Sequence, residues 1–334
     1  MPQRIGQYTV ATPSRPALLS YAAAVGNKEG DGPLGSCFDY IAEDTTMGRG
    51  SWEQAESMLQ KTAVQIALKK IDLAARQIDL IFAGDLLNQC IGSTFGLRDF
   101  GIPLIGLFGA CSTMALSLLN AALAVDAGAA RYAVAVTSSH FCSAERQFRQ
   151  PLDYGGQRPP TAQWTVTGAG ACVVGHGEGI AVEALTPGRV VDLGIKDANN
   201  MGAAMAPAAA DTILRFLKDT GTEPGDYDRI FTGDLGVIGS RLLCELLDKE
   251  GIDLRAVHRD CGVMIFDRER QDVHAGGSGC GCSASVLCAH ILPEMAAGRL
   301  KNVLFCATGA LMSPTSSQQG ESIPGIAHLV HLRA

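Results

Sequence analysis

The residue best placed to do chemistry in this sequence is Cys111, which follows a short apolar run and precedes a long apolar segment at residues 112–125. If the run is a strand and the segment a helix, the thiol lies at a helix N-terminus. Unpaired N–H groups and the positive dipole end lower a thiol pKa there, which suits a nucleophilic cysteine. A buried structural thiol is the competing interpretation, because the chain has 11 cysteines.

Two aspartates, Asp85 and Asp234, follow short apolar runs that share the pattern Ile-Phe-x-Gly-Asp-Leu. An aspartate in such a position can cap the helix that follows. Two matched carboxylates that converge can instead bind a cation or act as a base. Both interpretations remain open from the sequence.

Further candidate ligand contacts lie at other predicted strand exits. Ser139 and His140 follow a predicted strand, and Cys280 precedes an apolar helical segment. Ligands of open α/β sheets bind beyond the carboxyl ends of strands, so these side chains are candidate contacts. His140 is also a candidate base for Cys111, although a loop histidine can simply be exposed or hydrogen-bonded.

Three arginines, Arg146, Arg149 and Arg158, can hold an anionic ligand bidentately, or belong to a solvated loop.

No metal site is predicted, because the spacing of Cys280 and Cys282 is too tight for a structural zinc pair and no second pair matches it. The glycines at 276–279 lack the Lys-Ser/Thr ending of a phosphate loop. The sequence therefore predicts no cofactor.

The elements that must position these residues alternate between helical and strand patterns. The order helix, strand, helix, strand recurs in two halves, which indicates an α/β duplication. We predict an N-terminal half at 1–175 and a C-terminal half at 176–334, joined after an irregular loop at 151–165 that is rich in Pro, Gly and Gln. The predicted helices are 51–73, one ending near 101, 112–125, 203–217, 240–249 and 282–297; the predicted strands are 78–83, 102–108, 131–137, 170–174, 227–235, 301–307 and 325–331.

The composition excludes several classes of protein. With 334 residues, 47% hydrophobic and 18% charged, the chain is neither disordered nor strongly charged. Its net charge of −7 disfavours nucleic-acid binding. No apolar run reaches the length of a membrane span, and the first residues lack a signal core, so we expect a protein that is not secreted. The cysteines predict reduced thiols in a reducing compartment.

Several longer motifs resemble those of a known family. The two-copy order, with a cysteine before a buried helix, is similar to the thiolase superfamily, and the motifs more specifically resemble the stage V sporulation protein AD family of endospore-forming bacteria. They cover nearly the whole chain. The motifs lie at residues 28–35, 83–89, 108–113, 137–140, 144–149, 154–157, 205–212, 275–280 and 307–311.

The resemblance implies a thiolase-like fold, with two duplicated βαβ-type halves in a layered α-β-α-β-α arrangement, and a homodimer. It implies binding of dipicolinic acid or its calcium chelate for uptake into the developing spore. Membrane-embedded proteins of the same operon are the implied partners, at the cytoplasmic face of the spore inner membrane. In the family, the positions of Asp85 and Cys111 are linked to the ligand pocket.

The chain departs from the condensing enzymes of the superfamily. Those enzymes pair the cysteine with a histidine and with a second His or Asn, and here Asp234 and Cys280 fall at about these positions. A carboxylate cannot donate a hydrogen bond to a developing oxyanion, and an ionised Asp near Cys111 raises the thiol pKa. A non-catalytic binding protein is therefore expected. The alternatives are an active acyl transferase or ketoacyl synthase-like enzyme that uses Cys111, and a scaffold that binds no small molecule.

Overall fold

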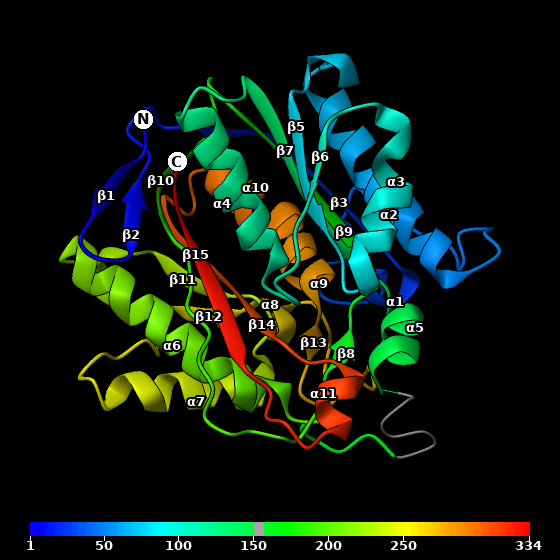
Figure 1. The fold of residues 1–334 in the computed structure, drawn as a ribbon, viewed down its shortest axis with the longest axis vertical. Helices are drawn as coiled ribbons and strands as arrows, with labels where there is room; N and C mark the ends of the chain where they lie inside the picture. The colour runs from blue at the N-terminus through cyan, green and yellow to red at the C-terminus, as the bar shows by residue number, and fades with distance from the viewer. Residues whose placement is uncertain (150–156) are drawn as a thin grey trace.

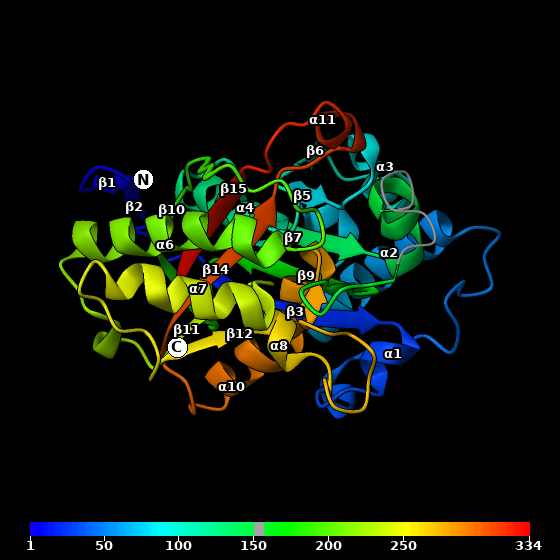
Figure 2. The same cartoon turned by 90° about the horizontal axis from the view of Figure 1, so that it is seen from below.

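The computed structural model describes residues 1–149 and 157–334, which form alternating layers of helix and strand (Figures 1 and 2). Two helices lie in the central layer, a group of strands flanks them on each side, and further helices cover the outer faces. The predicted α-β-α-β-α arrangement is confirmed. The central helices are α4 (Thr113–Asp126) and α9 (Cys280–Val286), and the outer ones are α2 (Trp52–Lys70) and α3 (Ile91–Leu97) on one side and α6 (Met201–Thr220) and α7 (Gly236–Asp248) on the other.

The main sheet consists of two five-strand groups with the same internal pattern. In each group two antiparallel pairings are followed by two parallel ones. The groups meet where Ala17 pairs with Ala181 and Leu18 with Ile180. The first group is β3 (Ala17–Val25), β9 (Gly168–Gly175), β7 (Tyr132–Ser139), β5 (Leu80–Gly84) and β6 (Leu104–Gly106), and the second is β10 (Ile180–Thr186), β15 (Gly325–Arg333), β14 (Asn302–Ala310), β11 (Arg229–Thr232) and β12 (His258–Asp260).

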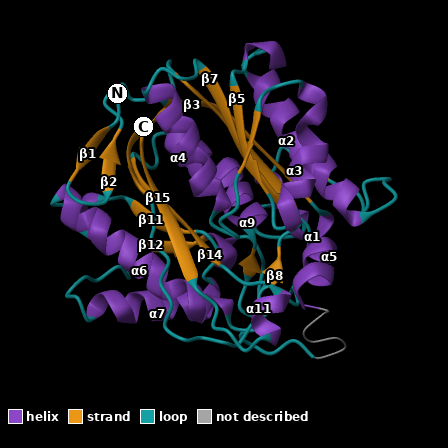
Figure 3. Cartoon of the chain, in the orientation of Figure 1, coloured by secondary structure: helices purple, strands orange, loops and turns teal. Residues whose placement is uncertain are grey.

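Shorter elements connect these layers (Figure 3). The predicted helix at 282–297 is interrupted, because a π-helical turn at Leu287–Ile291 separates α9 from α10 (Leu292–Ala296). The remaining named elements are α1 (Asn27–Gly30), β4 (Tyr40–Ile41), α5 (Phe141–Ala144), α8 (Cys261–Met264), β13 (Gly277–Ser278) and α11 (Pro314–Gln318).

The prediction of an irregular loop at 151–165 was wrong for the last two residues of that range. Trp164–Thr165 forms strand β8, which pairs in parallel with Gly277–Ser278 of β13. The composition of the loop did not reveal this pairing, because a two-residue strand depends on a partner more than 100 positions away. Residues 150–156 lie outside the described part of the chain.

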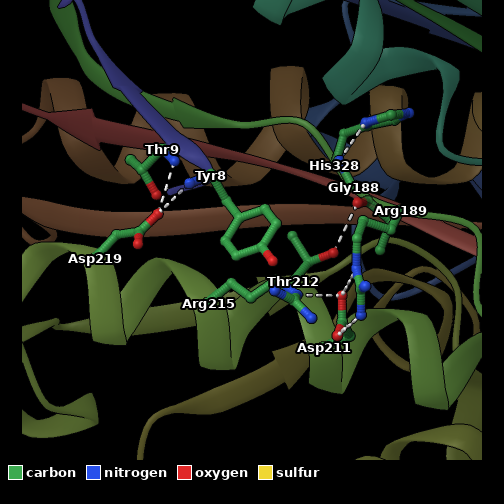
Figure 4. Close-up of polar contacts among 10 residues, drawn as sticks. Tyr8, Thr9, Gly188, Arg189, Asp211, Thr212, Arg215, Asp219 and His328 are labelled. Atoms are coloured by element: carbon green, nitrogen blue, oxygen red, sulfur yellow. Dashed lines mark hydrogen bonds and ion pairs between the residues drawn. The ribbon is translucent and has the colours of Figure 1, made fainter. Parts of the chain in front are cut away.

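The N-terminal hairpin, β1 (Gln3–Ile5) and β2 (Thr9–Ala11), packs on the second half through β10. Asp219 of α6 accepts a hydrogen bond from the backbone N–H of Gln7 at 2.9 Å. It also accepts hydrogen bonds from the backbone N–H groups of Tyr8 and Thr9 at 2.7 and 2.8 Å (Figure 4). The Arg215 guanidinium lies 3.9 Å from the centre of the Tyr8 ring. The start of the first predicted half therefore stabilises the outer helix of the second.

Burial follows the apolar patterns of the sequence. Helix α4 is buried along most of its length, as expected for a segment that is apolar nearly all round. Ser51 caps α2 by accepting a hydrogen bond from Gln54 N at 3.3 Å. Within the described residues, no helix combines the length and apolar character needed to cross a bilayer.

Candidate functional site

Cys111 lies in a tight turn between β6 and α4. Ser112 Oγ donates to the Gly109 carbonyl at 2.6 Å, and Thr113 Oγ1 donates to the Ala110 carbonyl at 2.6 Å. Ala110 has a left-handed backbone with φ of 50°, which is strained for a residue with a Cβ. The turn fixes the direction of the Cys111 side chain, which lines a cavity and is 6% exposed.

The second half of the chain shapes this turn through Gly309 of β14. A Cβ at Gly309 would lie 2.4 Å from the Gly109 carbonyl oxygen and 3.2 Å from Cys111 N. Only glycine permits that approach. The position of the cysteine in the first half thus depends on a glycine in the second.

Asp234 is fully buried beside Cys111, just after β11. Its carboxylate accepts hydrogen bonds from Gly279 N at 2.8 Å, Thr308 Oγ1 at 2.8 Å and Ser278 Oγ at 3.3 Å. Burial raises the pKa of Asp234 to about 6, so the group is largely ionised at pH 7. Asp234 does not cap the following helix, because its carboxylate instead holds the loop before α9.

The Cys111 thiol has a pKa well above its usual value, first because it is buried and second because the Asp234 carboxylate repels the thiolate and accepts a hydrogen bond from the thiol. The prediction that the helix end lowers this pKa was wrong. Cys111 precedes the N-cap residue Ser112 of α4, and burial with an adjacent negative charge outweighs the dipole. The thiol is therefore protonated at neutral pH.

Cys280 and Ser139 lie behind the cavity wall. Cys280 is fully buried and packs in a small cluster with Cys111, Leu86 and Ala144, and its thiol donates to the Ser138 carbonyl at 2.9 Å. Ser139 Oγ donates to the Val166 carbonyl at 2.7 Å and accepts from Gly281 N at 3.1 Å. Both side chains hold the start of α9 against the end of β7.

His140 does not pair with Cys111. Its Nδ1 accepts a hydrogen bond from Cys142 N at 3.2 Å, so its Nε2 carries the proton and donates to the Thr45 carbonyl at 2.7 Å. Burial lowers its pKa. The suggestion that His140 is a base for the cysteine was wrong. One ring nitrogen accepts a hydrogen bond at the N-terminus of α5, and the other donates to the Thr45 carbonyl.

Asp85 caps α3, one of the two interpretations left open by the sequence. Its carboxylate accepts from Leu87 N at 2.9 Å, from Ser93 N at 2.7 Å and from Ser93 Oγ at 2.6 Å. Asp85 is fully buried, and burial raises its pKa. The matched aspartates thus diverge, since Asp85 holds a helix start and Asp234 faces Cys111.

Glu56 of α2 is a buried carboxyl that the sequence patterns did not single out. It accepts hydrogen bonds from Ser143 Oγ at 2.9 Å and Ser138 Oγ at 3.2 Å. Burial and the nearby Asp85 carboxylate raise its pKa to about 8. No sequence signal marks it, because it occupies an ordinary helical position and only the fold brings the two carboxyls together.

Two of the three loop arginines contact acidic or backbone groups of the protein. Arg146 pairs with Glu53, and Arg158 pairs with Glu145 at 3.5 Å and donates to the Gln163 carbonyl. The side chain of Arg149 lies outside the described residues. Arg158 therefore braces the wall of the cavity, since Glu145 and Gln163 both line it.

The cavity beside Cys111 has a volume of about 370 Å³ and lies between the two halves of the chain. Among the six predicted site residues, Cys111 lines the cavity. The other five are buried and are not among its lining residues: Asp85, Ser139, His140, Asp234 and Cys280. Its apolar lining consists of Leu86, Phe108, Ala110, Ala144, Phe148, Ala198, Met201, Ala310 and Met312, and its polar lining of Cys111, Glu145, Gln163, Thr165, Lys196, Asn199, Ser278 and Ser317.

The described residues contain no group of three or more His, Cys, Asp or Glu side chains arranged to hold a metal ion. No histidine is among the described residues that line the cavity. The arrangement offers an apolar slot with a protonated thiol and several neutral hydrogen-bonding groups.

Comparison with known proteins identifies the family. A family model described as stage V sporulation protein AD (SpoVAD) matches residues 6–333. The chain belongs to the stage V sporulation protein AD family. A stage V sporulation protein AD from Bacillus subtilis (strain 168) is 48% identical over 310 residues, which cover 92% of this chain and 91% of that protein. The resemblance read from the motifs is confirmed.

Solved structures similar to this member of the stage V sporulation protein AD family include condensing enzymes. A 3-oxoacyl-[acyl-carrier-protein] synthase III from Aquifex aeolicus VF5 matches 96% of this chain and 100% of its own, with a TM-score of 0.59 and 14% identity. A tetronic acid condensing enzyme, AbyA1, matches 96% of this chain and 100% of its own, with a TM-score of 0.61 and 18% identity. These likenesses confirm the thiolase-like fold.

Proposed function

We propose that this protein binds dipicolinic acid, free or as its calcium chelate, in the cavity beside Cys111, and that it serves uptake of that ligand into the developing spore. Membership of the stage V sporulation protein AD family supports a role in sporulation. The cavity of about 370 Å³ lies within the size range of small-molecule sites. Phe108 and Phe148 offer aromatic surface to a planar ring.

We further propose that the protein is not a catalyst, and one observation carries this. The Cys111 thiol lies against the buried Asp234 carboxylate, which raises the thiol pKa and can only accept hydrogen bonds when ionised. Acyl condensation needs a nucleophilic thiolate and donors aimed at a developing oxyanion. The Asp234 carboxylate opposes both requirements, since it disfavours the thiolate and accepts hydrogen bonds where the enzymes need a donor, so we propose that the site binds a ligand without reacting with it.

Asp85 has a supporting role in this proposal. Its carboxylate fixes the backbone of Leu87 and the first turn of α3, and the adjacent Leu86 lines the cavity. Removing the carboxylate leaves buried N–H groups unpaired, which costs about 1–3 kcal/mol. Asp85→Ala should therefore weaken ligand binding by moving the wall, without a direct contact to the ligand.

The test is isothermal titration of the purified protein with dipicolinic acid, with and without calcium. We expect saturable heat from the wild type and weaker binding by Cys111→Ala and Asp85→Ala. The control is Asp31→Asn, because Asp31 is exposed. Absence of heat from the wild type would rule out the binding proposal.

A parallel experiment tests the enzyme alternative, which the similarity to condensing enzymes favours. The protein is incubated with an acyl-CoA and its mass is measured. We expect no acylation of Cys111. An acyl adduct that Cys111→Ala abolishes would contradict the non-catalytic proposal.

We propose that the protein forms a homodimer through β6. This strand pairs with β5 on one side, and no other described strand pairs with its outer edge. Leu104 and Ile105 on it are 37% and 40% exposed, and Phe95 and Phe108 nearby are 51% and 50% exposed. An apolar edge strand is a template for pairing, and two copies of β6 related by a two-fold axis would cover each other.

The dimer is tested by light scattering during size-exclusion chromatography. Ile105→Lys places a charge on the pairing edge and should shift the mass to that of a monomer. Leu193→Lys is the matched control, since Leu193 is an exposed leucine, 65% accessible, outside this edge. A dimer that survives Ile105→Lys would place the interface elsewhere.

We also propose, from the family alone, that membrane-embedded proteins of the same operon are its partners and that it lies at the cytoplasmic face of the spore inner membrane. The measurement is copurification of those proteins with the tagged chain from sporulating cells. Recovery of the tagged chain without them would count against this placement.

A further inference from the structure

Helix α5 contacts a buried carboxyl group on α2. Ser143 Oγ of α5 lies 2.9 Å from Glu56 Oε2 and 3.1 Å from the His140 carbonyl oxygen. The next residue, Ala144, lines the cavity and packs in the same buried cluster as Cys111. The contact between Glu56 and Ser143 therefore helps to position one part of the cavity wall.

The hydrogen bonds around Ser143 favour a neutral Glu56. A hydroxyl has one proton to donate, so Ser143 cannot donate to an ionised Glu56 and to the His140 carbonyl at once. If Glu56 Oε2 carries a proton, the acid donates to Ser143 Oγ, and Ser143 donates to His140. Both contacts are then hydrogen bonds. Burial, together with the nearby Asp85 carboxylate, raises the pKa of Glu56 to about 8, in agreement with this arrangement.

Glu56 and Asp85 are the two ends of one buried network. Ser138 Oγ lies 3.2 Å from Glu56 Oε1, and Ser93 Oγ donates to Asp85 at 2.6 Å. The Gln60 amide joins the two hydroxyls, because its Nε2 lies 3.3 Å from Ser138 Oγ and 3.0 Å from Ser93 Oγ. Asp85 also accepts two backbone N–H groups, which can only donate, whereas Glu56 contacts hydroxyls, which can also accept. The proton of the pair therefore lies on Glu56.

The other titratable groups around the pair do not compensate its charge. They are Glu53 on α2, Cys90 before α3, His140 after β7, Arg146 after α5 and Cys280 on α9. Burial lowers the pKa of the histidine and raises that of both cysteines, so these three stay largely neutral between pH 7 and pH 9. The other glutamate and the arginine pair with each other. In the part of the chain that the structure describes, no cation pairs with Glu56 or Asp85.

We infer that Glu56 is a positioning residue of the cavity, which in its neutral form holds Ser143 and α5 in place and in its ionised form weakens the binding of an anionic ligand. The inference rests on the proposed function, which supplies dipicolinate as that ligand. Ionisation removes the donor to Ser143, and it adds a second negative charge behind the wall that the anion faces. Since the proton is held up to a raised pKa, binding is favoured below that pKa and weakens as the pH rises through it.

Titration calorimetry with dipicolinate at pH 7 and pH 9, in the calcium condition that gives saturable heat, tests the inference. The carboxyls of the ligand are ionised throughout. If only the neutral form of Glu56 binds, the affinity of the wild type should fall about tenfold, because about one molecule in ten keeps its proton one pH unit above a pKa of about 8. Glu56→Gln has an amide that donates to Ser143 as the acid does. Its affinity should stay within about twofold of the wild-type value at pH 7 and should not fall at pH 9.

The matched control is Glu29→Gln. Glu29 is another buried carboxyl, its pKa is raised by burial to about 7, and it is not among the residues that line the cavity. The control should retain the tenfold fall, and circular dichroism at pH 9 checks that each protein is folded. If the wild type binds equally well at both pH values, or Glu56→Gln shows the same fall, the positioning role is overturned while the proposed function stands. If the wild type binds at neither pH, both are overturned.

Proton uptake provides a second measurement, which needs no Glu56 variant. Calorimetry at pH 8 in two buffers of different ionisation enthalpy reports the protons taken up when the ligand binds. Glu56 is about half ionised in the free protein at this pH, so we expect about half a proton per bound ligand, in the wild type and in Glu29→Gln. A purely structural role of Glu56 predicts no uptake. Uptake near zero, or uptake that Glu29→Gln abolishes, would overturn the inference even if Glu56→Gln failed to fold.

Discussion

Replacing Asp234 with Asn tests the claim that a carboxylate keeps Cys111 protonated. The substitution removes the charge and preserves the shape. The Asn Oδ1 can still accept from Gly279 N and Ser278 Oγ, which bond the same carboxylate oxygen in the wild type, and the Thr308 hydroxyl on the other oxygen can rotate to accept from the new amide. The variant should fold, and its Cys111 pKa should fall.

The magnitude follows from the contact between the two groups. Two unit charges about 4 Å apart interact by about 4 kcal/mol at an effective dielectric of 20, which corresponds to an upper bound of about 3 pKa units. Nucleophilicity declines as a thiol pKa falls, with a Brønsted coefficient of about 0.4–0.5. The net gain in alkylation rate is then about 3- to 4-fold per unit of pKa. A decrease of 1–3 units predicts roughly a 4- to 40-fold faster reaction.

The assay is iodoacetamide labelling at pH 8, with the modified peptides quantified by mass spectrometry. Peptides containing Cys172 and Cys306, which are buried away from the cavity, report any general loosening of the fold. Asp31→Asn controls for the change in net charge. If the Cys111 rate in Asp234→Asn stays within twofold of the wild type while the reference peptides are unchanged, Asp234 does not control the thiol.

Two further predictions concern buried groups. Burial raises the pKa of Glu29 from 4.5 to about 7, so the folded state binds this proton more tightly than the unfolded state, and stability falls as the pH rises through 7. Glu29→Gln should recover about 3 kcal/mol of unfolding free energy at pH 8 relative to pH 4, and parallel pH curves for variant and wild type in urea denaturation would contradict this. Gly309→Ala forces a Cβ to within 2.4 Å of the Gly109 carbonyl oxygen and should cost about 1–3 kcal/mol in the same assay. Gly225→Ala is its control because a Cβ there meets nothing within 4 Å, and equal stability of the two variants would show that the turn adjusts freely.

Sequence patterns correctly predicted those helices and strands whose own residues carry the apolar periodicity or capping signal of the element. The apolar segment at 112–125 became α4, Ser51 became the cap of α2, and the repeated Ile-Phe-x-Gly-Asp-Leu runs became β5 and β11. The two strands at the centre of the sheet, β3 and β10, were not predicted. Strand β3 contains four alanines, so its extended form depends on pairing with β9 and not on intrinsic preference.

The candidate site likewise combines features that the sequence predicted with features that it did not. Cys111 and Asp234 were identified from their positions after strands, and the structure places them in contact. Their electrostatics were only half predicted. The helix end is a local feature and was given too much weight, while the burial that dominates the thiol pKa arises from packing across the two halves.

The sequence by itself determined the family, the layered α/β fold and the cysteine around which the site is built, because these depend on motifs and on periodicities carried within single segments. The tertiary structure alone decided which groups share the cavity. Gln163, Lys196 and the start of α6 come from segments that no local pattern connects, and Glu56 meets Asp85 only when α2 packs on the sheet. The charges around a group, its burial and its hydrogen-bond partners depend on which residues are close in space, so only the folded chain determines them.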